Sequence, residues 1–149
     1  MFQIGIIFFD IGDTLAVVNP DVADRLDLLP LPGAVEALRR LSEAGLRLGV
    51  ISNTGDETSQ TMRRALQGAG LYAFLEPRLL IYSSEVGLTK NSPEIFRLAC
   101  ARAESQAEPE RCLFVGEDAA ERAFAVSVGL QVAESPAKAV EAAIAPQKP

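Results

Sequence analysis

Short apolar runs alternate with stretches of helical periodicity along the chain, and this alternation is the feature that most constrains the fold. The expected strands are short, apolar and followed by turn residues; they cover residues 5–9, 46–51, 79–82, 112–115 and 130–133. Runs of this kind are typical of a parallel sheet that is buried on both faces. A helix pattern occupies the interval after each strand, as right-handed crossover connections between parallel strands require.

The expected helices are identified by apolar stripes and by their start and stop residues. They cover residues 35–44, 62–69, 95–99, 119–128 and 137–145, and glycines follow the first two. Asp56 is the expected N-cap of the second helix, and Ser92 followed by Pro93 is the expected start of the third. The stretch 17–32 contains Pro20, Pro30 and Pro32, and we expect it to be a loop or a partial helix.

Together these elements predict an α/β protein. We expect a three-layer α/β/α sandwich around a Rossmann-like, mostly parallel five-stranded sheet. A chain of 149 residues corresponds to one domain, which we place at residues 1–145 with a C-terminal tail at 146–149.

Composition excludes several functional classes. The net charge is −6 and the sequence has no basic stripe, so we expect neither nucleic acid nor an anionic membrane surface as a partner. The absence of histidine removes Ser-His and Cys-His catalysis, phosphohistidine chemistry and most zinc sites. The apolar segment 1–9 has no basic region before it and is too short to span a bilayer, so we expect a buried strand there. With Cys100 and Cys112 as the only cysteines, we expect reduced core thiols and a cytoplasmic location.

Polar clusters follow four of the predicted strands, at residues 10–14, 52–54, 83–85 and 116–118. In open parallel sheets, ligands bind outside the carboxyl ends of the strands, close to the point where the strand order reverses. The sequence therefore predicts one shared site at this edge of the sheet.

The first three clusters offer groups suited to phosphate chemistry. Asp10 leaves a buried strand into a glycine-containing turn, which suits a carboxylate nucleophile or a magnesium ligand; the alternative is that Asp10 only caps backbone donors. The Ser52 hydroxyl and the Asn53 backbone amide could donate to a phosphoryl group, or could belong to an ordinary turn. Lys90, just ahead of a helix, could neutralise both nucleophile and phosphate, or could be solvated.

The fourth cluster has two interpretations, which are compatible with each other. Glu117, Asp118 and Glu121 place three carboxylates within five residues, which outlines a site for a hard cation. Asp118 and Glu121 also have the spacing of a capping box, in which they would be the N-cap and N3 residues of a helix. Glu117 precedes that cap and would stay free to bind a metal.

In this order, the four clusters resemble the four motifs of the haloacid dehalogenase-like (HAD) superfamily, from Ile6 to about Leu130. The resemblance implies Mg²⁺-dependent phosphoryl transfer through an aspartyl-phosphate on Asp10. Lys90 would pair with Asp10 and the phosphate, while Ser52 and Asn53 would bind the phosphoryl group. The implied metal ligands are Asp10, the Gly12 carbonyl, Glu117, Asp118 and Glu121.

Three departures from the family pattern qualify this prediction. Gly12 occupies the position where the family has a second aspartate as general acid and base, and we do not assume that Asp13 replaces it. Because general acid–base catalysis is typically worth about 10²–10⁴-fold, activity on ordinary phosphomonoesters should be low. Gly12 also leaves open a different class, a non-catalytic HAD-fold protein that binds a phosphorylated ligand or a protein partner.

The second departure is that Glu117 and Glu121 stand where the family usually has aspartates, and the additional methylene of each would shift the metal. The third is the absence of a cap domain, because the intervals between the motifs are too short to contain one. We therefore expect an open site that takes a phosphorylated small molecule or macromolecule. Self-association is the remaining expectation, since the second protomer of a homo-oligomer could cover the site.

Overall fold

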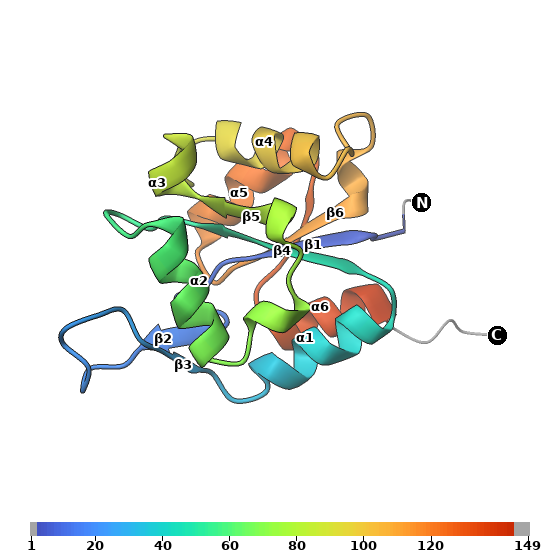
Figure 1. Cartoon of the computed structure of the whole chain (residues 1–149). Coiled ribbons are helices and arrows are strands. Elements are labelled where there is room, and N and C mark those ends of the chain that lie inside the picture. The colour runs from blue at the N-terminus through green and yellow to red at the C-terminus, as the bar shows by residue number, and fades with distance from the viewer. Residues whose placement is uncertain (1–2, 145–149) are drawn as a thin grey trace.

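The computed structural model describes residues 3–144 and is built around five parallel strands in the order β5-β4-β1-β6-β7 (Figure 1). The strands are β1 (Ile6–Phe9), β4 (Arg47–Ser52), β5 (Leu80–Tyr82), β6 (Cys112–Val115) and β7 (Gln131–Ala133). All five were predicted from the sequence, with ends that differ by at most one residue. The predicted parallel sheet is confirmed.

Strand β1 occupies the centre of this sheet. It pairs with β4 on one side, where Ile6 lies opposite Arg47, and with β6 on the other, where Ile6 lies opposite Cys112. All four β1 residues are buried. The residue that follows β1, Asp10, is therefore placed at the middle of the carboxyl edge, between the ends of β4 and β6.

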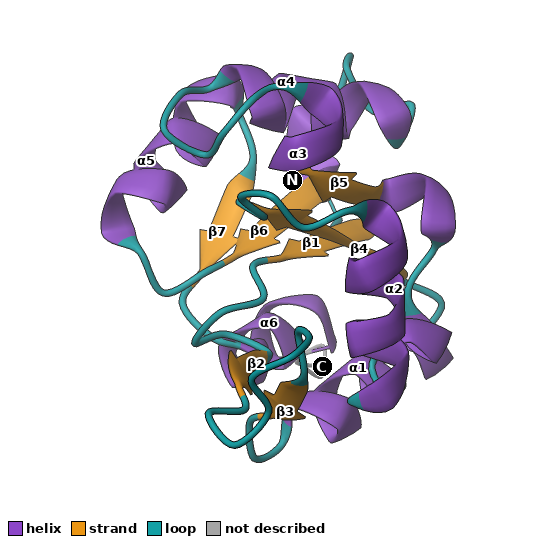
Figure 2. Cartoon of the chain, turned by 60° about the vertical axis from the view of Figure 1, so that its left-hand side comes forward, coloured by secondary structure: helices purple, strands orange, loops and turns teal. Residues whose placement is uncertain are grey.

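Helices cover both faces of the sheet, which confirms the three-layer sandwich (Figures 1 and 2). The helices are α1 (Ala34–Glu43), α2 (Ser59–Gly68), α3 (Ser83–Val86), α4 (Glu94–Arg102), α5 (Ala119–Val128) and α6 (Pro136–Ile144), with 3₁₀ turns at Tyr72–Phe74, Pro77–Leu79 and Pro109–Arg111. Ile7 and Phe9 share one core cluster with α1, α2 and α6. Ile6 and Phe8 share the other with α4 and α5. The side chains of a strand alternate between the two faces of its sheet, so both helix layers pack on the same central strand.

The prediction of a loop or partial helix for residues 17–32 was wrong at both ends of the stretch and right for residues 19–27. This stretch contains most of an antiparallel hairpin, in which β2 (Ala16–Val18) pairs with β3 (Leu28–Pro30) and Val18 lies opposite Leu28. Buried Ala16 and Leu28 attach the hairpin to the core that contains α1, α2 and α6. Three-residue strands are too short to show alternation, and Pro30 is tolerated because it ends an edge strand.

Two predicted helix starts were also wrong, by one or two residues. The N-cap of α2 is Thr58, not Asp56, because the Thr58 hydroxyl accepts the Thr61 N–H at 3.2 Å. Helix α4 begins at Glu94 after Pro93, with no side-chain cap, so Ser92 does not cap it. The predicted tail at 146–149 and the end of the last predicted helix at Ala145 lie outside the described residues.

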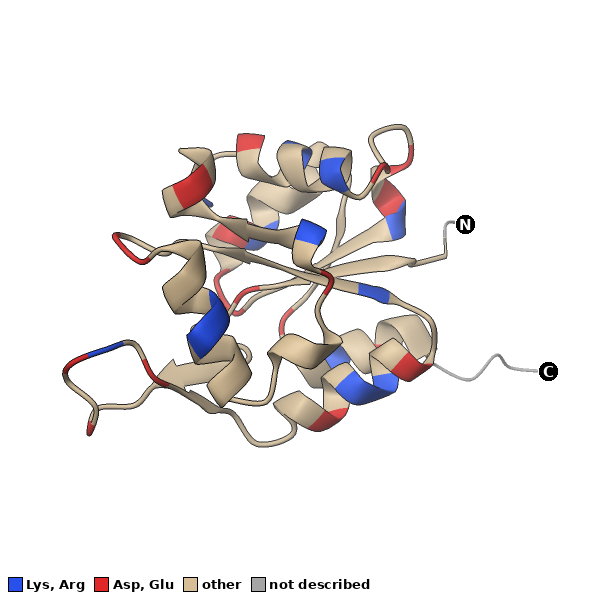
Figure 3. Cartoon of the chain, viewed as in Figure 1, with Lys and Arg blue, Asp and Glu red and all other residues tan. Residues whose placement is uncertain are grey.

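Helix hydrophobicity and the distribution of charged residues bear on membrane and nucleic-acid partners. Within residues 3–144, none of the helices is both long enough and apolar enough to cross a membrane. In the view of Figure 3, Lys and Arg are spread over several elements and alternate with acidic residues.

Candidate active site

Asp10 is held rigidly at the end of β1. Its backbone N–H donates to the Val115 carbonyl at 2.8 Å, and its Oδ2 accepts the Thr14 hydroxyl at 3.4 Å. Gly116 approaches from the end of β6 so closely that a Cβ there would lie 2.9 Å from the Phe114 ring and 3.5 Å from the Cβ of Asp10. A side chain at residue 116 would therefore displace its neighbours, and its absence leaves room for the Asp10 carboxylate.

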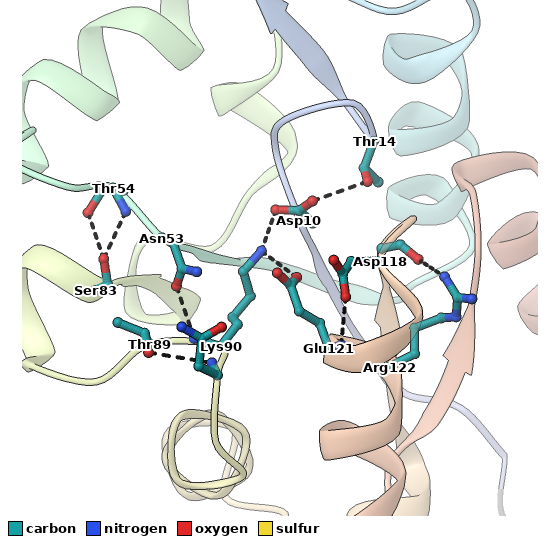
Figure 4. A network of polar contacts seen from close by, with 12 residues as sticks. Asp10, Thr14, Asn53, Thr54, Ser83, Thr89, Lys90, Asp118, Glu121 and Arg122 are labelled. Carbon is teal, nitrogen blue, oxygen red and sulfur yellow. Dashed lines mark hydrogen bonds and ion pairs between the residues drawn. The ribbon is translucent and has the colours of Figure 1, made fainter.

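Lys90 lies between two carboxylates in the interior of the site (Figure 4). Its Nζ is 2.5 Å from Asp10 Oδ1 and 2.9 Å from Glu121 Oε1, and its side chain is only 3% exposed. The Lys90 backbone N–H donates to Asn53 Oδ1 at 3.0 Å, which fixes the loop before α4 to the turn after β4. The alternative of a solvated Lys90 is therefore wrong.

Glu121 is the second acidic partner of this lysine. Burial raises the pKa of the Glu121 carboxyl above its ordinary value of 4.5, although Lys90 acts in the opposite direction. Its Oε1 is buried and is engaged by Lys90 Nζ in this ion pair. When all three groups are ionised, Asp10, Lys90 and Glu121 carry a net charge of −1.

The structure places Ser52 and Asn53 beside this cluster in different roles. Ser52 is the buried last residue of β4, and its hydroxyl makes no hydrogen bond with another described residue. The Asn53 side chain instead holds the Lys90 backbone. Ser52 is thus available to a phosphoryl group, whereas Asn53 contributes a positioning side chain that the sequence did not predict.

A hydroxyl network missed by the sequence analysis joins the turn after β4 to α3. The Thr54 hydroxyl donates to Ser84 Oγ at 2.8 Å, and the Thr54 N–H donates to Ser83 Oγ at 2.8 Å. Ser84 Oγ in turn donates to the Glu57 carbonyl at 2.6 Å. These residues lie in polar clusters visible in the sequence, but their pairing depends on β4 and β5 being neighbours.

A family model for haloacid dehalogenase-like hydrolases matches residues 17–129, which include Ser52, Lys90, Glu117 and Glu121. This chain belongs to the haloacid dehalogenase-like hydrolase family. Asp10 precedes the matched residues, so its placement beside Lys90 in the structure connects it to the family site. No curated protein gives a match to this chain.

Solved structures show the same HAD fold. An uncharacterized protein from Listeria monocytogenes serotype 4b is 18% identical with a TM-score of 0.72, covering 87% of this chain and 76% of that one. A HAD-superfamily hydrolase from Ehrlichia chaffeensis is 16% identical with a TM-score of 0.69, covering 93% and 95%. A dehalogenase with an intermediate complex is 26% identical with a TM-score of 0.62; the alignment covers 71% of this chain but only 44% of that chain.

The position of the usual second HAD aspartate has no acidic group. Gly12 does not adopt a left-handed conformation, and a Cβ built on it would meet nothing within 4 Å. Asp13 has φ 60° and lines a different hollow, together with Thr14 and the starts of α1 and α6. We therefore do not assign the role of the missing residue to Asp13.

The predicted metal ligands of this HAD site are only partly free. Among residues 3–144, no group of three His, Cys, Asp or Glu residues forms a ready-made metal cluster. Asp118 is the N-cap of α5, since its Oδ1 accepts the Glu121 N–H at 3.0 Å. The Glu121 carboxylate contacts Lys90 instead of completing the capping box, so only half of that predicted motif forms.

The remaining groups fit a hard cation. Glu117 is exposed and makes no hydrogen bond or ion pair with the described residues, and the Gly12 carbonyl accepts no backbone hydrogen bond in that part of the chain. The net negative charge that Asp10, Lys90 and Glu121 carry when all three are ionised also favours a cation at this edge.

Proposed function

We propose that this HAD-family chain is a Mg²⁺-dependent phosphatase that works through an aspartyl-phosphate on Asp10. The observation that carries the proposal is the contact of Lys90 Nζ with Asp10 Oδ1, in the interior of the carboxyl edge of the sheet. A buried lysine next to a fixed carboxylate can pair with that carboxylate and neutralise an incoming phosphate. Positioning and charge neutralisation are most of what phosphoryl transfer requires.

Each step can be assigned to residues of this site. An Asp10 oxygen attacks phosphorus and forms an acyl-phosphate bond, while the ester oxygen leaves with the electron pair of the broken P–O bond. Lys90 and the Ser52 hydroxyl contact the phosphoryl oxygens, and Thr14 orients the second Asp10 oxygen through its hydrogen bond. Water then attacks the phosphorus and releases inorganic phosphate and free Asp10.

Magnesium would be held by Asp10, the Gly12 carbonyl and Glu117, whereas Glu121 is engaged by Lys90. When bound, it supplies positive charge against the phosphoryl oxygens. We assign Asp118 to capping α5, because its Oδ1 is engaged by a backbone N–H.

Gly12 sets the kind of substrate that such a site can use. Without a general acid, the leaving group must depart without receiving a proton in the transition state. Acyl phosphates and nitrophenyl phosphate meet this condition, and sugar phosphates do not. We therefore expect turnover of acetyl phosphate and little or none of sugar phosphates.

The experiment is an acetyl phosphate hydrolysis assay with Mg²⁺ and with a chelator. Asp10→Asn and Lys90→Gln should each abolish turnover, whereas Lys138→Gln, which changes an exposed lysine on α6, should retain it. Calorimetric titration with Mg²⁺ should show a site that Asp10→Asn and Glu117→Gln both weaken. Turnover that survives Asp10→Asn would contradict the proposal, and binding of inorganic phosphate without any turnover would favour the non-catalytic alternative.

Carbon–halogen hydrolysis is the second candidate, favoured by the similarity to a dehalogenase structure at 26% identity and by Gly12. In that reaction an Asp10 oxygen would form a carbon–oxygen ester bond as halide leaves with the electron pair of the carbon–halogen bond. Halide needs no proton, so the missing acid would not hinder it. Halide release from 2-chloropropanoate, with no hydrolysis of acetyl phosphate, would select this candidate.

A further inference from the structure

A hollow of about 210 Å³ is lined by Gly12, Ser52 and Asn53 on the sheet side and by residues of the β2–β3 hairpin. We call it the hairpin hollow. Its apolar lining includes Val18, Leu26, Leu28 and, from α2, Met62. Ser52 ends β4, the strand next to β1, and Gly12 follows Asp10 by two residues, so the hollow adjoins the nucleophile. A group attached to a phosphate at Ser52 would therefore enter this hollow.

The hairpin presents one apolar face to the hollow. Residues that lie opposite each other in an antiparallel pair share a face, so Val18 and Leu28 point to the same side. Leu29 lies opposite Val17 and points to the other side. Val18 is 60% exposed and Leu29 is 43% exposed, so the two faces of one hairpin offer a matched pair of exposed apolar residues.

Charge around the hollow restricts its ligand further. Glu57 is the only ionisable residue among the hollow's described lining, and its Oε1 accepts the Thr61 hydroxyl at 2.9 Å. An acidic group here disfavours a second negative charge on a ligand. Met62, in the first turn of α2, also lines the hollow, and its flexible side chain adapts readily to apolar groups of different shapes.

We propose that the hairpin hollow is a leaving-group subsite for an uncharged apolar group about the size of one aromatic ring. This inference rests on the proposed function, because the group in the hollow is a leaving group only if the phosphoryl group binds at Ser52. The substrate class is thus a phosphate or acyl phosphate of a small aryl or branched alkyl group. A larger hollow of about 580 Å³ shares Val18, Leu26 and Glu57 with it, so longer groups can extend toward solvent.

The test is a binding measurement that needs no turnover. Phenylphosphonate and methylphosphonate carry the same anionic head, and calorimetry in the presence of Mg²⁺ gives the ratio of their affinities. We expect phenylphosphonate to bind roughly tenfold or more tightly, because its ring leaves water for an apolar surface. Equal affinities, or binding of neither compound, would overturn the subsite.

Matched variants locate the effect on the hairpin. Val18→Asn should lower the affinity ratio by roughly threefold or more, whereas Leu29→Asn, on the opposite face, should preserve it. An equal loss in both variants would contradict a subsite on the Val18 face. 4-Carboxyphenylphosphonate should bind less tightly than phenylphosphonate, and equal binding of these two would remove the charge restriction ascribed to Glu57.

The failure of this inference is distinguishable from failure of the proposed function. Acetyl phosphate turnover that depends on Asp10 tests the phosphatase, and the phosphonate affinity ratio tests the hollow. A ratio that depends on Val18 without any turnover would support the subsite and reject the phosphatase. Turnover with a ratio near one would do the reverse.

Discussion

Gly12 decides which leaving groups this active site can handle. An aspartate at residue 12 would restore a general acid, and the structure has space for it, since a Cβ there meets nothing within 4 Å. Gly12→Asp should therefore raise turnover of alkyl phosphates by about 10²–10⁴-fold, the usual contribution of acid–base catalysis. Steady-state kinetics on a sugar phosphate would measure the gain.

Gly12→Asn is the matched control for that substitution, because it has the same shape and no carboxyl proton. It should give no gain on alkyl phosphates. A folded Gly12→Asp protein that still binds Mg²⁺ but gains nothing over Gly12→Asn would contradict the role assigned to residue 12.

Glu121 should make stability depend on pH in a direction unusual for a carboxylate. Burial raises its pKa above 4.5, so the folded state retains a proton that the unfolded chain has already lost. The resulting stabilisation is fully present below 4.5 and is lost as pH rises through the folded-state pKa. Relative to wild type, Glu121→Gln should therefore gain unfolding free energy as pH rises from below 4.5 to neutral.

Urea unfolding across this pH range measures the difference. Glu117→Gln, which removes an exposed carboxylate from the same loop, is the control for the loss of one acidic side chain. A pH-independent difference for Glu121→Gln would show that burial does not control the ionisation of Glu121.

At the scale of elements, we assign Asp118 at the start of α5 to capping the helix and not to binding the metal. Asp118→Ala should lower the unfolding free energy by about 1 kcal/mol through loss of the N-cap hydrogen bond to Glu121. Asp118→Ser, which keeps a capping oxygen, should recover most of that stability. Mg²⁺ affinity should be unchanged in both, and a loss of affinity in a stable Asp118→Ser protein would assign Asp118 to the metal.

The elements that could be predicted are those whose signal is local. Buried runs such as β1 are apolar throughout, so the five sheet strands follow from the sequence. The β2–β3 hairpin could not be predicted, because three-residue strands have no period and their position depends on Ala16 and Leu28 packing against the sheet helices. Thr58 and Asp56 are both suitable N-cap residues, so the sequence alone does not choose between them. The Glu57 carbonyl, which lies between them, accepts a hydrogen bond from Ser84, and no local sequence pattern predicts this tertiary contact.

The same distinction holds for the site. Asp10, Ser52 and Lys90 could be predicted because each follows or precedes a recognisable element. The contact of Lys90 with Glu121 and the tether from Asn53 could not, since both depend on how loops from different strands meet.

At the scale of the whole molecule, the site has no covering domain within residues 3–144. The hairpin shelters only one side of it, and excluding water from a small substrate requires more cover. We therefore expect the protein either to self-associate, so that a second copy covers the site, or to act on a macromolecule. Sedimentation velocity should show a dimer or larger species in the first case; a strict monomer that hydrolyses small metabolites efficiently would contradict both.

The central claim is that Asp10 becomes phosphorylated, and trapping this intermediate tests it most directly. Without an aspartate at residue 12, no general base activates water against the aspartyl-phosphate, so the intermediate should be long-lived. Incubation with acetyl phosphate and Mg²⁺, followed by acid quenching and peptide mass spectrometry, should find one phosphoryl group on the peptide that contains Asp10. Asp10→Asn should abolish it. Hydrolysis without any phosphorylated Asp10 peptide, or phosphorylation that persists in Asp10→Asn, would contradict the account.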